Sequence, residues 1–222
     1  MPAFHPSFET LPAEIPVFPL PGALLLPQGR LPLNIFEPRY LAMVSDALGA
    51  GRMFGMVQPR PDAARAASRP GLYGVGCLGR LTSFAETEDG RFLVTLTGVI
   101  RFGLAEEVAM RRGYRRVRAD YAPWRADLDI DAPPPALDRG ALLTASCAYF
   151  RARGIEVNRE AVEKAADAML VTTLSMVCPF DVREKQALLE APDVEERARM
   201  LVALLQMGAH GRAASPGSGR PS

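Results

Sequence analysis

Side chains that could serve as a nucleophile and a general base are scarce in this 222-residue sequence. The two histidines, His5 and His210, lie in terminal segments that are predicted to be disordered, because these segments carry no apolar anchor. A serine nucleophile needs a base within hydrogen-bond reach, so a Ser-His pair is disfavoured. A Ser-Lys pair is disfavoured too, since Lys185 is predicted on a solvated helical face and Ser175 among core residues.

The cysteines and carboxylates do not indicate a metal or thiol site. Cys77, Cys147 and Cys178 are far apart and distant from any histidine, so they are interpreted as small buried hydrophobes in a reducing compartment. A catalytic thiol is the less favoured alternative. The acidic groups Glu106-Glu107 and Glu86–Asp89 are predicted at strand ends and a hairpin tip, without the histidine or cysteine typical of zinc sites. We therefore expect no catalytic residues, no cofactor and no metal.

One basic run, Arg111–Arg118, is the clearest candidate for binding. On a strand, Tyr114, Arg116 and Arg118 share one face, and Trp124 follows shortly before a proline-rich segment. Aromatic and arginine side chains are enriched at binding hot spots, which makes these four the predicted partner-binding residues. Neighbouring acids offset the charge of the run, so a plain solvated strand, an acidic protein partner and nucleic acid all remain as interpretations.

The composition is that of an ordinary globular protein. The formal net charge is +1 and hydrophobic residues make up 48% of the chain, so the whole molecule does not favour an acidic partner. The longest apolar stretch, Ala23–Leu26, is far too short for a bilayer, and the N-terminus lacks the features of a signal peptide. We therefore expect a soluble cytoplasmic protein without membrane association.

The elements that must position these residues divide into a strand-rich part and a helical part. Short β-type runs separated by glycine and proline predict strands at Ile15–Leu20, Leu31–Phe36, Met53–Gln58, Leu72–Phe84, Phe92–Leu104 and Tyr114–Tyr121. A helix is expected over Pro38–Leu48, because proline suits its first position. Gly90 completes the hairpin turn between two of the strands, and the loop 59–70 is expected to be mobile.

After Asp131–Pro135 the pattern becomes helical. Asp138 is predicted to cap a helix that ends at Gly154, and Asn158 to cap the next. The pairs Asp181/Glu184 and Asp193/Glu196 are typical of capping boxes. The predicted organisation is an extended N-terminal segment at 1–13, a β-barrel at 14–130, a proline hinge at 131–137, a helical subdomain at 138–208 and a disordered tail at 209–222.

Several separated motifs occur in an order that resembles the Lon protease N-terminal domain family in a stand-alone bacterial form. The resemblance covers about Ala13 to Met207. It is carried by Ile15–Gly22, Leu31–Tyr40, Gly74–Leu81, Asp89–Arg91, Thr97–Phe102, and Lys185–Glu190 followed by Arg197. This likeness implies an α+β fold: a small antiparallel, PUA-like β pseudo-barrel with one inserted helix, followed by a C-terminal helical bundle.

The resemblance also implies a function in substrate recognition related to proteolysis. In full-length Lon proteases this domain precedes an ATPase domain and a Ser-Lys peptidase domain, whereas this sequence contains no G-x-x-x-x-G-K-[ST] phosphate loop. We therefore expect a non-catalytic module that binds polypeptide segments, either at an open barrel edge or in a cleft between barrel and helices. The alternative is an RNA-binding module that uses Arg111–Arg118, although nucleic acid is the less expected partner. The sequence specifies neither the client nor the oligomeric state.

Overall fold

The computed structural model describes residues 6–61, 71–156 and 159–210, and the chain divides into two compact units. The first unit is formed by residues 1–132 and 175–190, the second by residues 133–174 and 191–222. The boundary after Ala132 falls within the proline-rich segment that the sequence indicates as a hinge. Residues 175–190, which the sequence pattern groups with the helical part, belong instead to the first unit.

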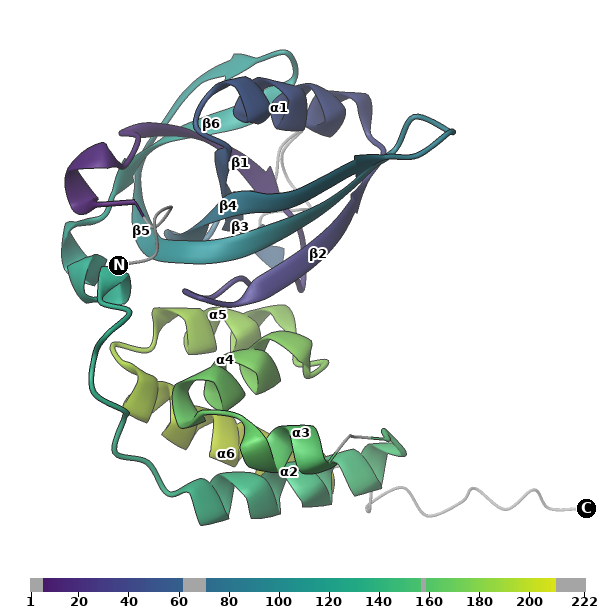
Figure 1. The fold of residues 1–222 in the computed structure, drawn as a ribbon, viewed down its shortest axis with the longest axis vertical. Helices are drawn as coiled ribbons and strands as arrows, with labels where there is room; N and C mark the ends of the chain where they lie inside the picture. The colour runs from purple at the N-terminus through teal and green to yellow at the C-terminus, as the bar shows by residue number, and fades with distance from the viewer. Residues whose placement is uncertain (1–5, 62–70, 157–158, 211–222) are drawn as a thin grey trace, which may run out of the picture. The chain divides into compact units, whose positions relative to one another are not determined.

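Six strands build one sheet in the first unit, and Figure 1 shows them curving into a ring. A single helix, α1 (Pro38–Gly49), is inserted between the second and third strands, and proline occupies its first turn as expected. The strands are β1 (Glu14–Pro19), β2 (Arg30–Ile35), β3 (Met53–Val57), β4 (Val75–Glu86), β5 (Phe92–Arg111) and β6 (Tyr114–Asp120). Short 3-10 helices, η1 (Phe8–Thr10) and η3 (Ala122–Leu128), flank the sheet in sequence.

The strand order closes the sheet. Neighbours run β2-β5-β4-β3-β1-β6, and β6 also pairs with β5, so every strand except β2 belongs to a closed ring. β1 and β3 are parallel, while the other pairs are antiparallel. The predicted α+β pseudo-barrel is therefore confirmed, with one parallel pair that the sequence pattern did not indicate.

β5 is much longer than the strand predicted from Phe92 to Leu104. Its first half pairs with β2 and its second half with β6, and register shifts mark β-bulges in its pairing with both β4 and β6. The β5–β6 hairpin turns at Arg112 and Gly113, whose positive φ values of 48° and 86° are typical of a two-residue turn. Glu106 and Glu107, expected at a strand end, consequently lie within this hairpin and pair with β6.

The interior of the ring is filled by side chains. Phe102 is fully buried at its centre, with the apolar side chains of Ile15, Leu78 and Val117 around it. A Cβ placed on Gly76 would lie 2.6 Å from the Phe102 ring. Glycine at this position of β4 is therefore required by the aromatic ring that it faces, which is the close approach that glycine in a strand often marks.

A further helix of the first unit, α5 (Val182–Glu190), is attached by buried polar contacts. Its capping box is confirmed: Glu184 N–H donates to Asp181 Oδ1, and Asp181 N–H donates to Glu184 Oε2, both at 2.8 Å. Lys185, predicted on a solvated face, is instead 7% exposed. Its Nζ donates to the Gly22 carbonyl at 2.7 Å, and burial lowers the pKa of the Lys185 ammonium.

The second unit is helical. It contains α2 (Arg139–Arg153), α3 (Arg159–Lys164), α6 (Val194–His210) and most of α4 (Asp167–Val177). The cap at Asp138 is confirmed by a 2.8 Å bond from the Ala141 N–H, and Gly154 ends α2 with a φ of 64°. The expected single helix after residue 158 is wrong, because α3 and α4 are separate helices.

The last helix continues further than predicted. The predicted helical subdomain ends at residue 208, but α6 continues to His210, which therefore lies in a helix and not in the predicted tail. A Cβ on Gly208 would lie 2.6 Å from the Tyr149 ring, so this glycine permits close packing of α2 against α6. Of the other expectations, the loop from residue 62 to 70, the cap at Asn158, the tail from residue 211 and His5 lie outside the described residues.

Candidate functional site

Among the residues that the structure describes, Ser175 and Lys185 do not form a catalytic pair and no metal-binding cluster is present. The hydroxyl of Ser175 is buried and has no hydrogen-bond partner there, and both bonds from Lys185 Nζ go to main-chain carbonyls. The Ser-Lys pair considered above therefore does not form. Within the same residues, no group of three or more histidine, cysteine, aspartate or glutamate side chains could hold a metal ion. None of the described helices has the length and hydropathy needed to cross a bilayer.

Tyr114 was predicted as an outward-facing residue, and this is wrong. Its side chain is buried, at 2% exposure, and its hydroxyl donates to Asp46 Oδ2 at 2.7 Å. Desolvation, with a smaller contribution from the Asp46 hydrogen bond, raises the pKa of Tyr114 to about 12. The same bond is the main reason that the pKa of Asp46 is lowered. Tyr114 therefore fastens α1 to the β5–β6 hairpin and is not available to a partner.

Arg116 and Arg118 are accessible, but both are engaged with carboxylates. Arg116 Nη2 lies 2.8 Å from Glu14 Oε2, and Arg118 Nη1 lies 2.8 Å from Glu106 Oε2. Glu14 also contacts Arg118, so the two arginines share one acid on β1. Further along the run, Arg111 and Arg112 pair with Asp46, and Arg115 pairs with Glu107. Glu106 and Glu107, which the sequence places near the run, therefore offset its charge together with Glu14 and Asp46, which are distant in sequence.

Trp124 lies apart from these arginines. It is half-buried in η3, with non-helical backbone angles, and packs against the hydrophobic core of the first unit. A Cβ on Gly103 would be in ordinary contact with its indole, at 3.5 Å. The structure thus brings Arg116 and Arg118 together at Glu14, but it does not add Tyr114 or Trp124 to one continuous exposed surface.

A group of exposed apolar side chains that was not predicted from the sequence lies where β4 and β5 extend beyond the ring and β2 pairs with β5. We call this three-stranded region the arm; it comprises Arg30–Ile35, Ser83–Glu86 and Phe92–Thr97. At its end three large side chains are exposed, with exposed fractions of 64% for Phe36, 41% for Phe84 and 47% for Leu93. The half-buried Phe92 meets Phe84 edge to face, with ring centroids 5.0 Å apart.

One signal for this group was present in the sequence. Leu93 occupies a position on the strand whose neighbours on the same face, Thr95 and Thr97, are polar. The partners of Leu93 across the arm are Asn34 on β2 and Ala85 on β4, so this leucine lies on a face without other large apolar groups. Phe84 and Phe92 lie on the opposite face, because Phe84 pairs with Val94 and Glu86 with Phe92, so the end of the arm exposes apolar side chains on both faces, which indicates an interaction surface.

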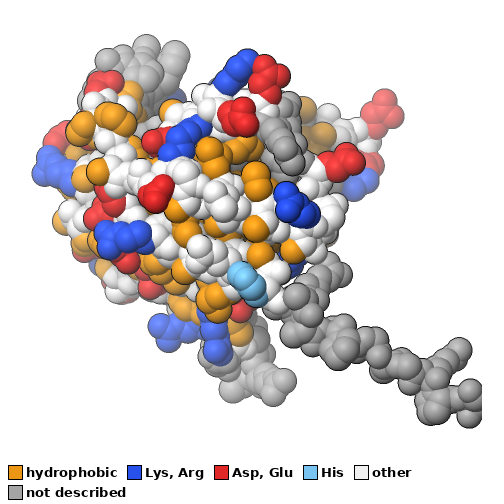
Figure 2. Space-filling model, turned by 90° about the horizontal axis from the view of Figure 1, so that it is seen from below, with side chains coloured by type: hydrophobic (Ala, Val, Ile, Leu, Met, Phe, Trp, Pro, Cys, Tyr) orange, Lys and Arg blue, Asp and Glu red, His pale blue; other side chains and the backbone are white. Residues whose placement is uncertain are grey.

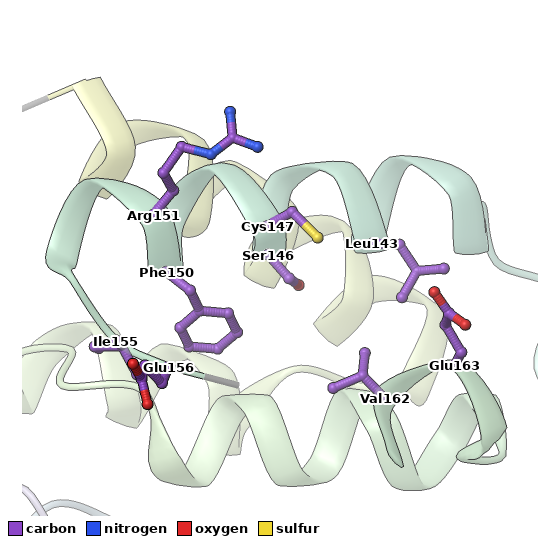
Figure 3. A pocket seen from close by; sticks show the side chains of 9 residues that line it. All are labelled: Leu143, Ser146, Cys147, Phe150, Arg151, Ile155, Glu156, Val162 and Glu163. Atoms are coloured by element: carbon purple, nitrogen blue, oxygen red, sulfur yellow. The ribbon is translucent and has the colours of Figure 1, made fainter. Parts of the chain in front are cut away.

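A cleft in the second unit is a further hollow surface (Figure 3). Its volume is about 540 Å³, within the size range of ligand sites. Phe150 and Val162 point into it, whereas Arg151 points away. Cys147 lines this cleft and is exposed, so the prediction that all three cysteines are buried is wrong for Cys147 and confirmed for Cys77 and Cys178.

Charge is dispersed on the face of the molecule drawn in Figure 2. Lysine, arginine, aspartate and glutamate side chains are scattered there among apolar side chains, and no broad area of one sign is visible. A polyanion would require a continuous basic surface, and this side does not provide one.

The fold is that of an α+β domain with a closed ring of strands, and comparison with known proteins identifies the family. Residues 14–207 match the ATP-dependent protease La (LON) substrate-binding domain, and the chain belongs to this family. Lon protease 2 of Sorangium cellulosum is 27% identical over 228 residues, covering 92% of this chain and 26% of that protein. Lon protease 1 of Thermus thermophilus is also 27% identical, covering 89% of this chain and 25% of that protein. The chain therefore spans about a quarter of the length of these curated relatives.

Solved structures show the same fold. A Lon N-terminal domain protein from Xanthomonas campestris superposes with a TM-score of 0.60 at 23% sequence identity, covering 86% of this chain and 97% of that one. The N-terminal domain of a Mycobacterium avium complex Lon protease gives a TM-score of 0.55 at 16% identity, with the same coverage.

Proposed function

We propose that this protein binds exposed apolar segments of other polypeptides and performs no chemistry on them. The observation that carries the proposal is the exposed apolar end of the arm, with the Phe84–Phe92 pair on one face of the sheet and Leu93 on the other, and with Phe36 directly after β2. Large apolar side chains exposed on both faces of one sheet end are costly to leave in water and favour a protein partner. Membership of the substrate-binding family supports the same conclusion.

A polypeptide partner is favoured over RNA by the ion pairs of the Arg111–Arg118 run. Their guanidinium groups already contact Asp46, Glu14, Glu106 and Glu107, so they are poorly suited to neutralise phosphates. The proposal locates the activity in the cytoplasm, because the three cysteines are free thiols, as is typical of a reducing compartment.

The test compares two surfaces with one probe. A fluorescent peptide rich in phenylalanine and leucine is titrated with the parent protein, with Phe84→Ser/Leu93→Ser, and with Arg116→Ala/Arg118→Ala. We expect the arm variant to weaken peptide binding roughly tenfold or more, in the range of hot-spot losses, because the apolar contact is removed. The arginine variant should bind the peptide with at most a few-fold loss.

The controls separate the alternatives. A serine-substituted peptide of equal length should bind poorly, and peptide affinity should depend weakly on salt. Circular dichroism verifies that both variants are folded. Steeply salt-dependent binding of a single-stranded RNA, lost in Arg116→Ala/Arg118→Ala, together with no peptide binding, would favour the RNA alternative instead. Peptide binding lost only in the arginine variant would move the site to the surface predicted from the sequence.

A further inference from the structure

The outer edge of β2 has main-chain groups turned away from the sheet. The Gly98 N–H donates to the Gly29 carbonyl at 2.8 Å, so the carbonyl of Gly29 faces β5. In an antiparallel pair every second residue bonds the same neighbour. Leu31 and Leu33 therefore face β5, whereas the residues between them, Pro32 and Asn34, turn their main-chain groups outward.

Two independent features agree with this alternation. Thr87 N–H donates to the Arg91 carbonyl at 2.9 Å, so Arg91 faces β4. Every second residue of β5 after Arg91 therefore also bonds β4, and the residues between them bond β2. Pro32 has no N–H and therefore fits only a position that need not donate to β5. Within the described ranges, β2 pairs with β5 alone, so its outer side has no strand partner.

The accessible edge of β2 is short and offers few main-chain hydrogen-bonding groups. Arg30, Pro32 and Asn34 are all exposed. The carbonyls of Pro32 and Asn34 and the N–H of Asn34 can each bond an added chain, whereas the missing N–H of Pro32 interrupts a longer ladder. Proline and a charged residue are devices that keep sheet edges from pairing with further copies of the same protein. This edge therefore suits a brief extended segment better than a second copy of the chain.

Side chains beside the edge define the chemistry of that segment. A strand added to β2 would place alternate side chains next to Leu31 and Leu33, which are half-buried, and its other side chains next to Asn34 and Pro32. The strand β2 leads directly to Phe36 at the apolar end of the arm. Apolar residues in alternate positions would thus be covered, and polar ones would stay in water.

We propose that β2 receives a short extended polypeptide segment, apolar at alternate positions, as an added strand of the sheet. The proposal rests on the polypeptide-binding function proposed above and specifies how the segment is held. Main-chain hydrogen bonds to Pro32 and Asn34 contribute affinity independent of sequence, and the row containing Leu31 and Leu33 selects the apolar pattern.

The experiment removes main-chain hydrogen bonds without removing apolar surface. The probe is a fluorescent peptide with leucine or phenylalanine at alternate positions, compared with two versions that are N-methylated on alternate peptide bonds. The peptide that is methylated on the N–H groups facing β2 should bind the parent protein at least tenfold more weakly, because those donors are blocked. The peptide that is methylated on the N–H groups facing solvent should bind like the unmodified peptide.

A matched pair of protein variants tests the same edge. Asn34→Pro removes the outward N–H but leaves the pairing with β5, as Pro32 already does, and should weaken peptide binding by about the same factor. Asn34→Ala keeps the N–H and should bind within twofold of the parent. If Asn34→Pro does not fold, the two methylated peptides on the parent protein decide the question alone.

The outcomes separate strand addition from the broader function. Peptide binding that is lost in Phe84→Ser/Leu93→Ser but is insensitive to N-methylation and to Asn34→Pro would overturn strand addition and leave polypeptide binding intact. No binding of any peptide to the parent protein would overturn both. Self-association of the parent that Asn34→Pro abolishes, measured by sedimentation without peptide, would show that the edge receives a second copy instead.

Discussion

β5 passes through two different environments, the closed ring and the arm. In the ring it carries the fully buried Ile100 and Phe102, and it pairs with β4 up to Gly103 and with β6 from Gly103 onward. In the arm it carries Leu93, 47% exposed, and is paired with β2 and β4, which have no further neighbours there among the described residues. One strand thus combines a support built on a buried core with a region whose edge strands can still accept a partner.

A β-bulge marks the transition between the two environments. Leu78 pairs with Ile100, but the next residue of β4, Gly79, pairs with Gly98, so Val99 is the extra residue. A bulge bends the strand and increases its twist, which redirects the residues that follow. The arm therefore leaves the ring at a defined position, and effects on stability should be large on one side of the bulge and small on the other.

The largest effect on stability is expected where the ring is joined to η3. The buried Arg101 donates to Asp127 through Nε and Nη2, both at 2.8 Å. Asp127→Ala would leave this guanidinium buried without its carboxylate, which should lower the free energy of unfolding by about 3–5 kcal/mol. Urea denaturation followed by circular dichroism measures the change. The control Arg118→Ala, at an exposed ion pair, should cost at most about 1 kcal/mol. Equal costs for both variants would contradict the comparison.

A smaller loss is expected at the junction itself. A Cβ on Gly98 would overlap the main-chain carbonyl of Leu26, which cannot move aside as a flexible side chain would. Gly98→Ala should therefore cost about 1–3 kcal/mol through overpacking. Gly49→Ala is the matched control, because nothing lies within 4 Å of a Cβ at that helix end. If thermal melting shows the two alanine variants to be alike, close approach at the junction is not what requires glycine.

A still smaller effect is expected at the Tyr114–Asp46 contact, with a defined pH dependence. Because the folded-state pKa of Asp46 lies below its ordinary value of 3.8, this carboxylate stabilises the protein above that pH. The stabilisation is lost as the pH falls through 3.8 towards the folded-state pKa. Tyr114→Phe removes the largest cause of the shift and should cost about 1 kcal/mol at neutral pH.

The measurement is the free energy of unfolding of parent and Tyr114→Phe above and below pH 3.8. The difference between the two proteins should shrink at the lower pH, because Asp46 becomes protonated in both. A difference that stays constant or grows would show that Tyr114 acts through packing alone.

The arm should show the smallest effect on stability and the largest effect on binding. Phe84→Ser/Leu93→Ser, the variant expected above to weaken peptide binding, should change the free energy of unfolding by no more than about 1 kcal/mol, because both side chains are substantially exposed. A cost as large as that of Asp127→Ala would show that the arm belongs to the folding core, and the comparison between ring and arm would fail.

The sequence by itself determined the elements whose signals are local. The strand runs before the proline-rich segment, the turn at Gly90, the cap at Asp138 and the capping box at Asp181/Glu184 all appear where the pattern indicates them. These features depend on neighbouring residues only, because a cap or a tight turn satisfies its own backbone groups. The sequence motifs likewise identified the family.

Tertiary structure decided which side chains are buried. Uniform alternation along β6 places Tyr114 with the outward arginines, yet Tyr114 and Val117, three residues apart, are both buried. The reason is that α1 packs against β6, so the Tyr114 hydroxyl reaches Asp46 on that helix and the side chain is covered although it lies on the face of the arginines. No local pattern on a strand reports a helix that covers one end of its outer face.

The burial of Lys185 and the position of the candidate site also depend on tertiary structure. A lysine beside a capping box is typical of a solvated helix, but the Gly22 carbonyl, far away in sequence, receives its ammonium in a buried contact. The outward edge of β2 is also defined only by the strands that do and do not pair with it. Burial and free hydrogen-bonding capacity are properties of the assembled sheet, and they became visible only once its strand order and register were known.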